Sequence, residues 1–204
     1  MGMVCTLKRV NGAKVDEIAA SPETARGLIE DNADRDFPLE EVRMPGCLGL
    51  LLRLTPIKVT QLAQRPEGDS PELLDDPDRM DIEVWDVINF FLTGSPTRGE
   101  FPASFLVEGG EHIEDEDDEP DLRVFTAQQV GQIDTYLQTL SRDDLKARID
   151  IPAMIKARLL SRPRKNTPDR NMEYLGHVLD DFESLKTFIH ATHERSAGLL
   201  VRVS

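Results

Sequence analysis

The chain has 204 residues, 39% of them hydrophobic, with 38 acidic against 24 basic side chains and a net charge of −14. A domain of this length buries about 70% of its unfolded surface, so it needs no disulfide or metal to hold it together. The negative charge repels phosphate backbones and anionic membranes, which argues against nucleic-acid and membrane binding. It suits a basic protein partner instead.

The cysteines and the N-terminus indicate the cellular setting. Cys5 and Cys47 stand among apolar residues, which predicts buried free thiols. No apolar run approaches the roughly 20 residues that span a bilayer. Lys8 and Arg9 follow the first apolar stretch, whereas a signal peptide has its basic residues first. We therefore expect a soluble cytoplasmic protein.

The first 31 residues predict a strand and two short helices. Residues 3–10 are rich in apolar and β-branched side chains, which favours a strand. Helices are expected at about 13–20 and 22–31. Ser21 can cap the second of these, with Pro22 in its first turn.

Residues 32–80 differ from the rest, because they contain six prolines with acidic patches between them. We interpret this segment as an insertion with one packed element. That element is the apolar run at 46–54, which predicts either a buried strand or a short helix. Periodicity does not decide between the two.

A helix is predicted over about 82–93, with Asp81 as its cap. The apolar residues of this helix fall at helical spacing on one face, and Trp85, the one tryptophan of the chain, is among them. Gly94 supplies the stop, and Pro96 prevents continuation.

Two short strands and a capped helix are predicted next. The strands cover 103–108 and 122–125. Thr126 and Gln129 have the spacing of a capping box, which opens a helix that reaches about Leu140.

The C-terminal part reads as helices followed by a strand. Ser141 begins one helix and a short one follows Pro152, after which 161–170 is a loop. A long helix over about 172–194 carries a buried apolar stripe, and 199–203 is a strand.

These elements predict an α/β fold with an α+β fold as the alternative. We expect a single compact domain over residues 1–204, with a few-stranded mixed sheet covered by helices. The sequence does not indicate an oligomeric state.

Several segments, in this order, resemble the YfbM-like proteins, a bacterial family of unknown function. The resemblance covers about three quarters of the chain and is carried by Met1–Met3 with Leu7–Val10, Asp81–Ser95, Phe105–Glu111, Phe125–Thr126 with the helix after it, Leu140–Leu145 and Leu185–Ser204. It implies a compact α/β domain and no enzyme class. Asn89 stands where these proteins often carry histidine.

One convergent polar set is a candidate binding site. Trp85, Asn89 and Thr93 lie on one side of the predicted helix because they are four residues apart. With Glu108 and His112 from the turn near Gly109 they would line a cleft. The competing interpretation places Trp85 in the core.

No complete metal or cofactor set is recognised, so we expect neither. His190, His193 and Glu194 have a spacing found in zinc sites, but His193 is expected near the centre of the apolar stripe, in a structural role. The acidic run at 111–121 has no glycine of the kind a calcium loop needs, and is expected to be a solvated loop.

The sequence thus favours an acidic protein that binds or regulates a partner, of the kind represented by immunity proteins that neutralise a basic target. The alternative is a small-molecule enzyme that uses Asn89, Glu108 and His112. No catalytic residue is assigned, and whether the protein is an enzyme is left open, with non-enzymatic binding preferred.

Overall fold

The computed structural model describes residues 3–30, 77–113, 121–161 and 167–204. They belong to one compact unit, Met1–Asp31 with Asp76–Ser204. Its strands are β1 (Cys5–Val10), β2 (Arg79–Ile82), β3 (Glu111–His112), β4 (Leu122–Phe125) and β5 (Gly198–Val203). Its helices are η1 (Gly12–Lys14), α1 (Val15–Ala19), α2 (Pro22–Glu30), α3 (Trp85–Thr93), α4 (Ala127–Gln138), α5 (Arg142–Ala147), α6 (Ile151–Lys156) and α7 (Pro168–Glu194).

The strands form one sheet in the order β2-β1-β5-β4-β3. Every strand pair among the described residues is antiparallel. The prediction of a mixed sheet is therefore wrong. The first and last strands of the chain lie side by side at its centre, with Leu7 opposite Val201. The few-stranded sheet covered by helices is confirmed, and an α+β description fits it as well as α/β.

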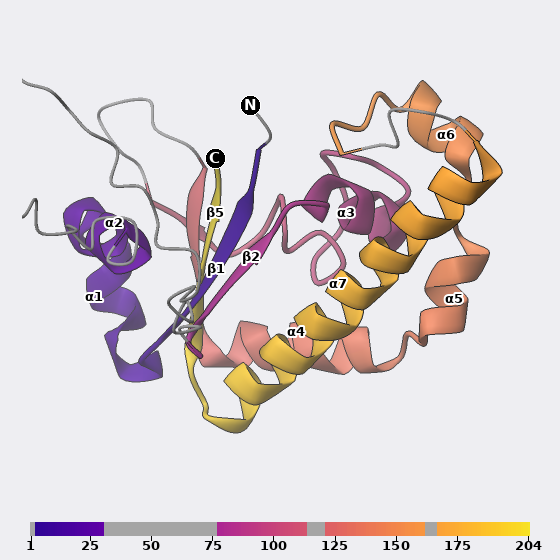
Figure 1. The fold of residues 1–204 in the computed structure, drawn as a ribbon. Coiled ribbons are helices and arrows are strands. Elements are labelled where there is room, and N and C mark those ends of the chain that lie inside the picture. The colour runs from indigo at the N-terminus through magenta and orange to yellow at the C-terminus, as the bar shows by residue number, and fades with distance from the viewer. Residues whose placement is uncertain (1–2, 31–76, 114–120, 162–166) are drawn as a thin grey trace, which may run out of the picture. The chain divides into compact units, whose positions relative to one another are not determined.

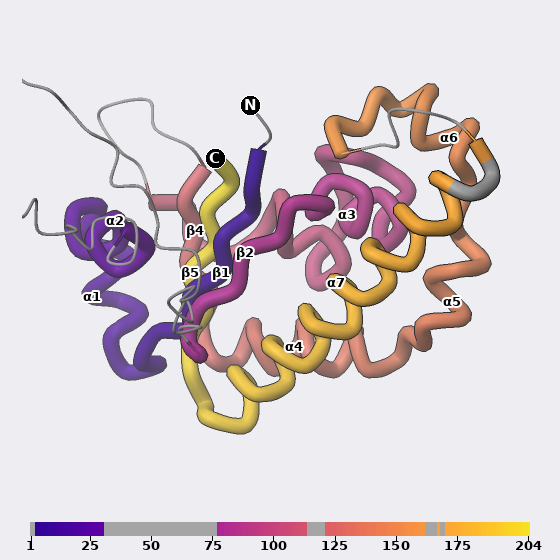
Figure 2. Tube along the Cα trace, in the orientation of Figure 1, coloured from indigo at the N-terminus to yellow at the C-terminus, as the bar shows by residue number. Residues whose placement is uncertain are grey.

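Helices cover both faces of the sheet (Figures 1 and 2). Residues alternate between the faces because successive side chains of a strand point in opposite directions. Leu7, Val201 and Phe125 join the larger core with α3, α4 and α7. Val124 and Leu200 face the smaller core with α1 and α2.

The helix that carries Trp85 begins later than predicted. Asp81 does not cap it, because residues 79–82 form the edge strand β2, where the Thr6 hydroxyl donates to the Asp81 carboxylate at 2.6 Å. The helix starts at Trp85 and ends at Thr93, and Gly94 after it provides the predicted stop with a φ of 77°. Arg79 lies in the sheet although the predicted insertion reached residue 80.

The predicted strand at 103–108 is wrong. Residues 101–108 form consecutive turns, in which the Val107 and Glu108 amides both donate to the Ser104 carbonyl. Phe105 and Leu106 are neighbours and both are fully buried, which a half-buried strand does not allow. Arg123 of β4 satisfies carbonyls of this turn by donating to Phe105 and Leu106.

Other local predictions are confirmed by the hydrogen bonds of the helix ends. The capping box of Thr126 and Gln129 opens α4, and Ser141 with Asp144 forms a second one at α5. Helix α7 starts at Pro168, four residues before the predicted start. The acidic run begins with ordered structure, because His112 lies in β3 and Ile113 is buried.

Some predictions lie outside the described residues: the element at 46–54, Cys47 and acidic residues 114–120. The interpretation of the segment after residue 31 as an insertion stays a prediction. None of the helices in the described part of the chain has the length and apolar character of a membrane span.

Candidate functional site

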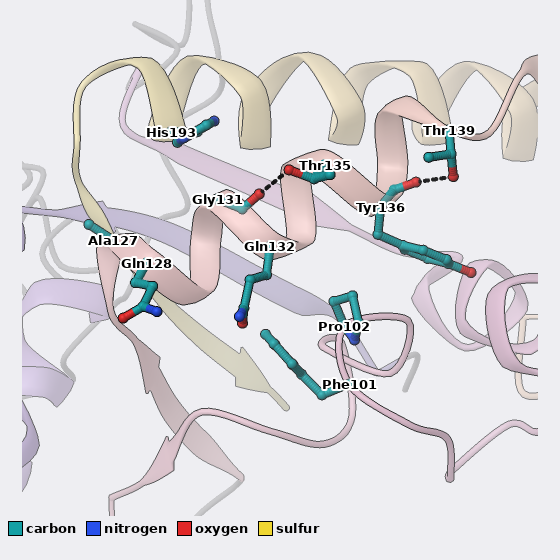
Figure 3. Close-up of a pocket in the computed structure, with 10 residues that line it drawn as sticks. All are labelled: Phe101, Pro102, Ala127, Gln128, Gly131, Gln132, Thr135, Tyr136, Thr139 and His193. Atoms are coloured by element: carbon teal, nitrogen blue, oxygen red, sulfur yellow. Dashed lines mark hydrogen bonds between the residues drawn. The ribbon is translucent and has the colours of Figure 1, made fainter.

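An open groove of about 750 Å³ runs along the outer side of α4. Most of its lining comes from α4, and the rest from the 101–102 turn and the end of α7 (Figure 3): Phe101, Pro102, Ala127, Gln128, Gly131, Gln132, Thr135, Tyr136, Thr139 and His193. A smaller concavity of about 420 Å³ shares Gln128 and Gln132 with it and continues toward Gly110.

Two parallel rows of side chains make up the helical wall of the groove. Residues four apart lie above one another on a helix. One row is therefore Gln128, Gln132 and Tyr136, and Figure 3 shows Gln132 directed toward Phe101. The other row is Gly131, Thr135 and Thr139, with His193 of α7 at its Gly131 end.

The hydroxyl groups of the groove all donate to main-chain carbonyls. Thr135 Oγ1 donates to the Gly131 carbonyl at 2.8 Å, and Thr139 Oγ1 donates to the Tyr136 carbonyl at 2.6 Å (Figure 3). Tyr136 Oη donates to the Leu92 carbonyl at 3.2 Å. A hydroxyl has one hydrogen and two lone pairs, so each of these oxygens can still accept a hydrogen bond.

A buried carboxylate joins the groove helix to α7. Asp134 is 5% exposed, and its Oδ2 lies 2.8 Å from His193 Nδ1 and 3.1 Å from His190 Nδ1. Gln138 donates to its other oxygen at 3.1 Å. The carboxylate thus has three partners from two helices, which satisfies a polar group that is otherwise costly to bury.

The pKa shifts of this cluster follow from its contacts. Burial raises the pKa of Asp134, but the hydrogen bonds from His193, His190 and Gln138 outweigh burial, and the net pKa is lowered. The hydrogen bond and charge of Asp134 raise the pKa of His190. Because an ionised carboxylate only accepts hydrogen bonds, Nδ1 of His193 carries a hydrogen that it donates to Asp134.

The absence of a side chain at Gly131 leaves space for the His193 ring. A Cβ at residue 131 would lie 3.2 Å from His193 Nε2, closer than most real contacts. The predicted position of His193 near the centre of the apolar stripe is wrong, because its side chain is 44% exposed. Ile189 and Thr192 take the buried positions on α7 instead.

Three of the predicted site residues meet around the turn after α3. Asn89 is fully buried, and its amide donates to the Ser95 carbonyl at 2.9 Å. Thr93 donates to the same carbonyl at 2.8 Å, and Glu108 accepts from the Gly99 amide at 3.1 Å. These bonds satisfy main-chain groups of the turn, so the three side chains hold it in place.

The two remaining predicted residues have other surroundings. Trp85 is 6% exposed and packs in the larger core, as the competing interpretation proposed. It also lines one edge of a concavity of about 550 Å³. His112 is exposed on β3 and lies 3.3 Å from an Asp121 oxygen, so its partner is Asp121 and not Glu108.

Sequence reasoning missed the α4 groove for a definable reason. Gln128, Gln132, Thr135 and Thr139 are unremarkable exposed helix residues in the sequence. The usable signal was Asp134, a charged residue between Ile133 and Leu137 on the apolar side of α4. A carboxylate on a buried face predicts a polar partner on the facing helix.

Comparisons with known proteins place the chain in a family without an assigned activity. No curated protein matches it. Its fold is similar to the crystal structure of YfbM, a protein of unknown function from Escherichia coli, with a TM-score of 0.61, 14% identity and coverage of 98% of this chain and 99% of that chain. At this identity the likeness shows the fold alone.

A family model described as a domain of unknown function, DUF1877, matches residues 44–202. The match begins within the segment 32–80, which is predicted to be an insertion, and continues into β5. The resemblance to YfbM-like proteins is thereby confirmed, and the chain belongs to the DUF1877 family of domains of unknown function.

Proposed function

We propose that the protein acts by binding, and that the α4 groove is where its described unit holds a ligand. The observation that carries this proposal is that two rows of polar side chains on α4 line the same groove as Phe101 and Pro102, with the Thr135 and Thr139 hydroxyls held by main-chain carbonyls. A regular helix holds such groups with little loss of freedom on binding. Half-buried apolar side chains opposite them add area that a ligand can cover.

The groove is best tested with a variant that fills it. Thr135 is exposed in the middle of α4, and replacing it with arginine leaves the core untouched. Thr187 is the matched control, because it is an exposed threonine in the C-terminal half of α7 whose hydroxyl donates to the Glu183 carbonyl at 2.9 Å. We expect Thr135→Arg to abolish ligand binding and Thr187→Arg to retain it.

The measurement is an amide NMR spectrum of labelled protein during titration with a small-molecule set that spans cations, neutral polyols, anions and short peptides. Shifts that concentrate at Gln128, Gln132 and Tyr136, and vanish in Thr135→Arg, support the proposal. If no member of any class shifts these residues, the groove is not a binding site.

A second candidate is acid–base catalysis, favoured by the contact of Asp134 with His193. A carboxylate on Nδ1 orients an imidazole for proton transfer at Nε2 in many hydrolases. The test is whether a ligand bound in the groove changes chemically on incubation. Conversion that is lost in His193→Gln would favour an enzyme, whereas a ligand recovered unchanged favours binding.

The net charge supports the further proposal of a basic protein partner for the whole chain. The described residues carry 22 acidic and 16 basic side chains, a net of −6 against −14 for the full sequence. The full chain therefore steers cations more strongly than the described unit does. A bacterial cytoplasmic setting is part of this proposal, supported by the free buried Cys5 and by the likeness to YfbM.

A further inference from the structure

In the groove along α4, the two threonine hydroxyls donate to main-chain carbonyls and have lone pairs left to accept. Thr135 and Thr139 direct their hydrogens to the carbonyls of Gly131 and Tyr136. A hydroxyl that donated outward would give up its own hydrogen bond to the carbonyl. Their lone pairs are therefore what the groove offers.

His193 extends the same row. Its Nδ1 lies 2.8 Å from the Asp134 carboxylate, and in the tautomer that donates its hydrogen to this carboxylate the lone pair of the ring is on Nε2. That nitrogen lies beside Gly131, one helical turn from Thr135. Three acceptors thus follow one line along α4. Gln128 and Gln132 can turn either amide atom toward a ligand, so they do not change this preference.

Ligand groups that only donate match such a row best. A guanidinium has five N–H donors and an ammonium has three, and neither has an acceptor. A carboxylate or phosphate would face the row lone pair to lone pair. Charge points the same way, since the chain carries −14 and Asp134 places an ionised carboxylate beneath His193.

The other side of the groove suits the stem of such a ligand. Phe101 and Pro102 are half-buried, and the Phe101 ring stacks on Phe125 at 6.2 Å between centroids, which fixes its plane. The aliphatic stems of arginine and lysine pack well on apolar rings, and their cations are attracted to ring faces. Tyr136 adds a second ring on the helix.

We infer that the ligand group held in this groove is an alkyl guanidinium or ammonium, with its head on the row of His193, Thr135 and Thr139 and its stem on Phe101 and Pro102. This inference rests on the proposed function and names the ligand class. Two sources share the chemistry: a free amine or guanidine, and an arginine or lysine side chain of a protein partner.

The experiment titrates labelled full-length protein with N-acetyl-arginine amide and with its neutral analogue N-acetyl-citrulline amide. We expect the arginine derivative to shift the amides of the groove and the citrulline derivative to bind about tenfold more weakly, since a hydrogen bond with a charged donor is the stronger kind. Equal binding of the two would overturn the inference.

Isosteric variants test the acceptors directly. Thr135→Val and Thr139→Val remove the oxygens and keep the shape, and each should weaken arginine binding about tenfold. Thr187→Val on α7 is the matched control and should leave it unchanged. Circular dichroism verifies that all three variants fold. Undiminished binding in both groove variants would show that the hydroxyls are not the acceptors, and would refute the inference.

The same titrations distinguish a small ligand from a side chain of a partner. They also distinguish failure of the cationic ligand class from failure of the binding function. Saturation by the single amino-acid derivative identifies a small ligand, whereas saturation by a hexa-arginine peptide alone identifies a side chain of a partner. A neutral or anionic molecule that fills the groove in preference to both would refute the cationic class and leave the binding function standing. Absence of any groove ligand would refute both.

Discussion

Asp134 Oδ2 on α4 and His193 Nδ1 on α7 lie 2.8 Å apart, although the two residues are 59 positions apart in the sequence. The contact joins the helix that forms the groove to α7, the longest of the described helices. It also decides which nitrogen of His193 carries a hydrogen, and so links the packing of the two helices to the chemistry of the groove.

Replacing Asp134 by asparagine should destabilise the protein by about 1–3 kcal/mol, the usual range when a buried group loses its partner. The new amide nitrogen would confront the N–H of His190 or His193, or that of Gln138. Urea unfolding measures the loss. Asp143, an exposed residue in the first turn of α5, is the control, and Asp143→Asn should change stability by less than about 0.5 kcal/mol. Equal losses in the two variants would mean that the cluster contributes nothing to stability.

The same cluster predicts that folding stability depends on pH in two opposite ways, through Asp134 at low pH and through His190 at higher pH. Asp134 has a lowered pKa in the folded state, so its contribution is present above the unfolded value of about 3.9 and is lost as pH falls through the folded pKa. His190 has a raised pKa, so its contribution is present below about 6.5 and is lost as pH rises.

The stability difference between wild type and Asp134→Asn should therefore be largest between about pH 4 and 6.5 and decrease on both sides. Urea unfolding of both proteins at pH 3, 5 and 8 measures it. A difference that keeps increasing toward pH 8 would contradict the sign assigned to His190.

Local sequence signals predicted the starts of α4 and α5 well, and they predicted the starts of α3 and α7 and the long-range contacts poorly. The capping boxes of α4 and α5 lie within four residues and depend on nothing distant, so their side-chain types suffice. The periodic stripe of α7 likewise identified its buried face. By contrast, β2 and β3 have four and two residues, which is too short to show an alternating pattern of apolar and polar side chains. These strands form because they pair with β1 and β4.

The candidate site shows the same division. The sequence placed Asn89 and Thr93 on one side of α3, which is correct, but it could not show that both would bind the Ser95 carbonyl. Helical spacing alone also could not decide whether His193 is buried or exposed, because residues 189 and 192 fit the buried stripe of α7 equally well. Its exposure depends on where α4 crosses α7, and that crossing is fixed by the packing of many residues.

Arg123 should be among the most sensitive positions of the sheet. Its side chain is 4% exposed and lies 3.0 Å from the Asp121 carboxylate while it donates to the Phe105 and Leu106 carbonyls. Arg123→Met would leave the two carbonyls without their donor, at a loss of about 1–3 kcal/mol for each one that stays buried.

Thermal and urea unfolding test this prediction, with Arg170→Met as control, because Arg170 is exposed and its partner Glu173 is on the same helix. A small loss in Arg123→Met would indicate that the 101–108 turn holds its shape without the arginine.

Cys5 should be chemically inert in the folded protein. Burial raises the pKa of its thiol to about 12, and the side chain is fully buried between β2 and β5. Iodoacetamide at pH 8 should therefore leave Cys5 unmodified until denaturant is added. Mass spectrometry of the peptide that contains Cys5 follows its modification without interference from Cys47. Modification at the same rate with and without denaturant would contradict the buried position of β1.

Trp85 offers a test that separates core packing from ligand binding. The residue is 6% exposed, and its Nε1 has no hydrogen-bond partner among the described residues. Trp85→Ala should therefore destabilise the protein by about 3–5 kcal/mol, whereas Trp85→Phe, which keeps a ring and loses no hydrogen bond, should cost less than about 1.5 kcal/mol. Urea unfolding of both variants measures this. If Trp85 were instead the floor of a ligand site, Trp85→Ala would cost below about 1 kcal/mol, and that outcome would return the cleft around α3 to consideration.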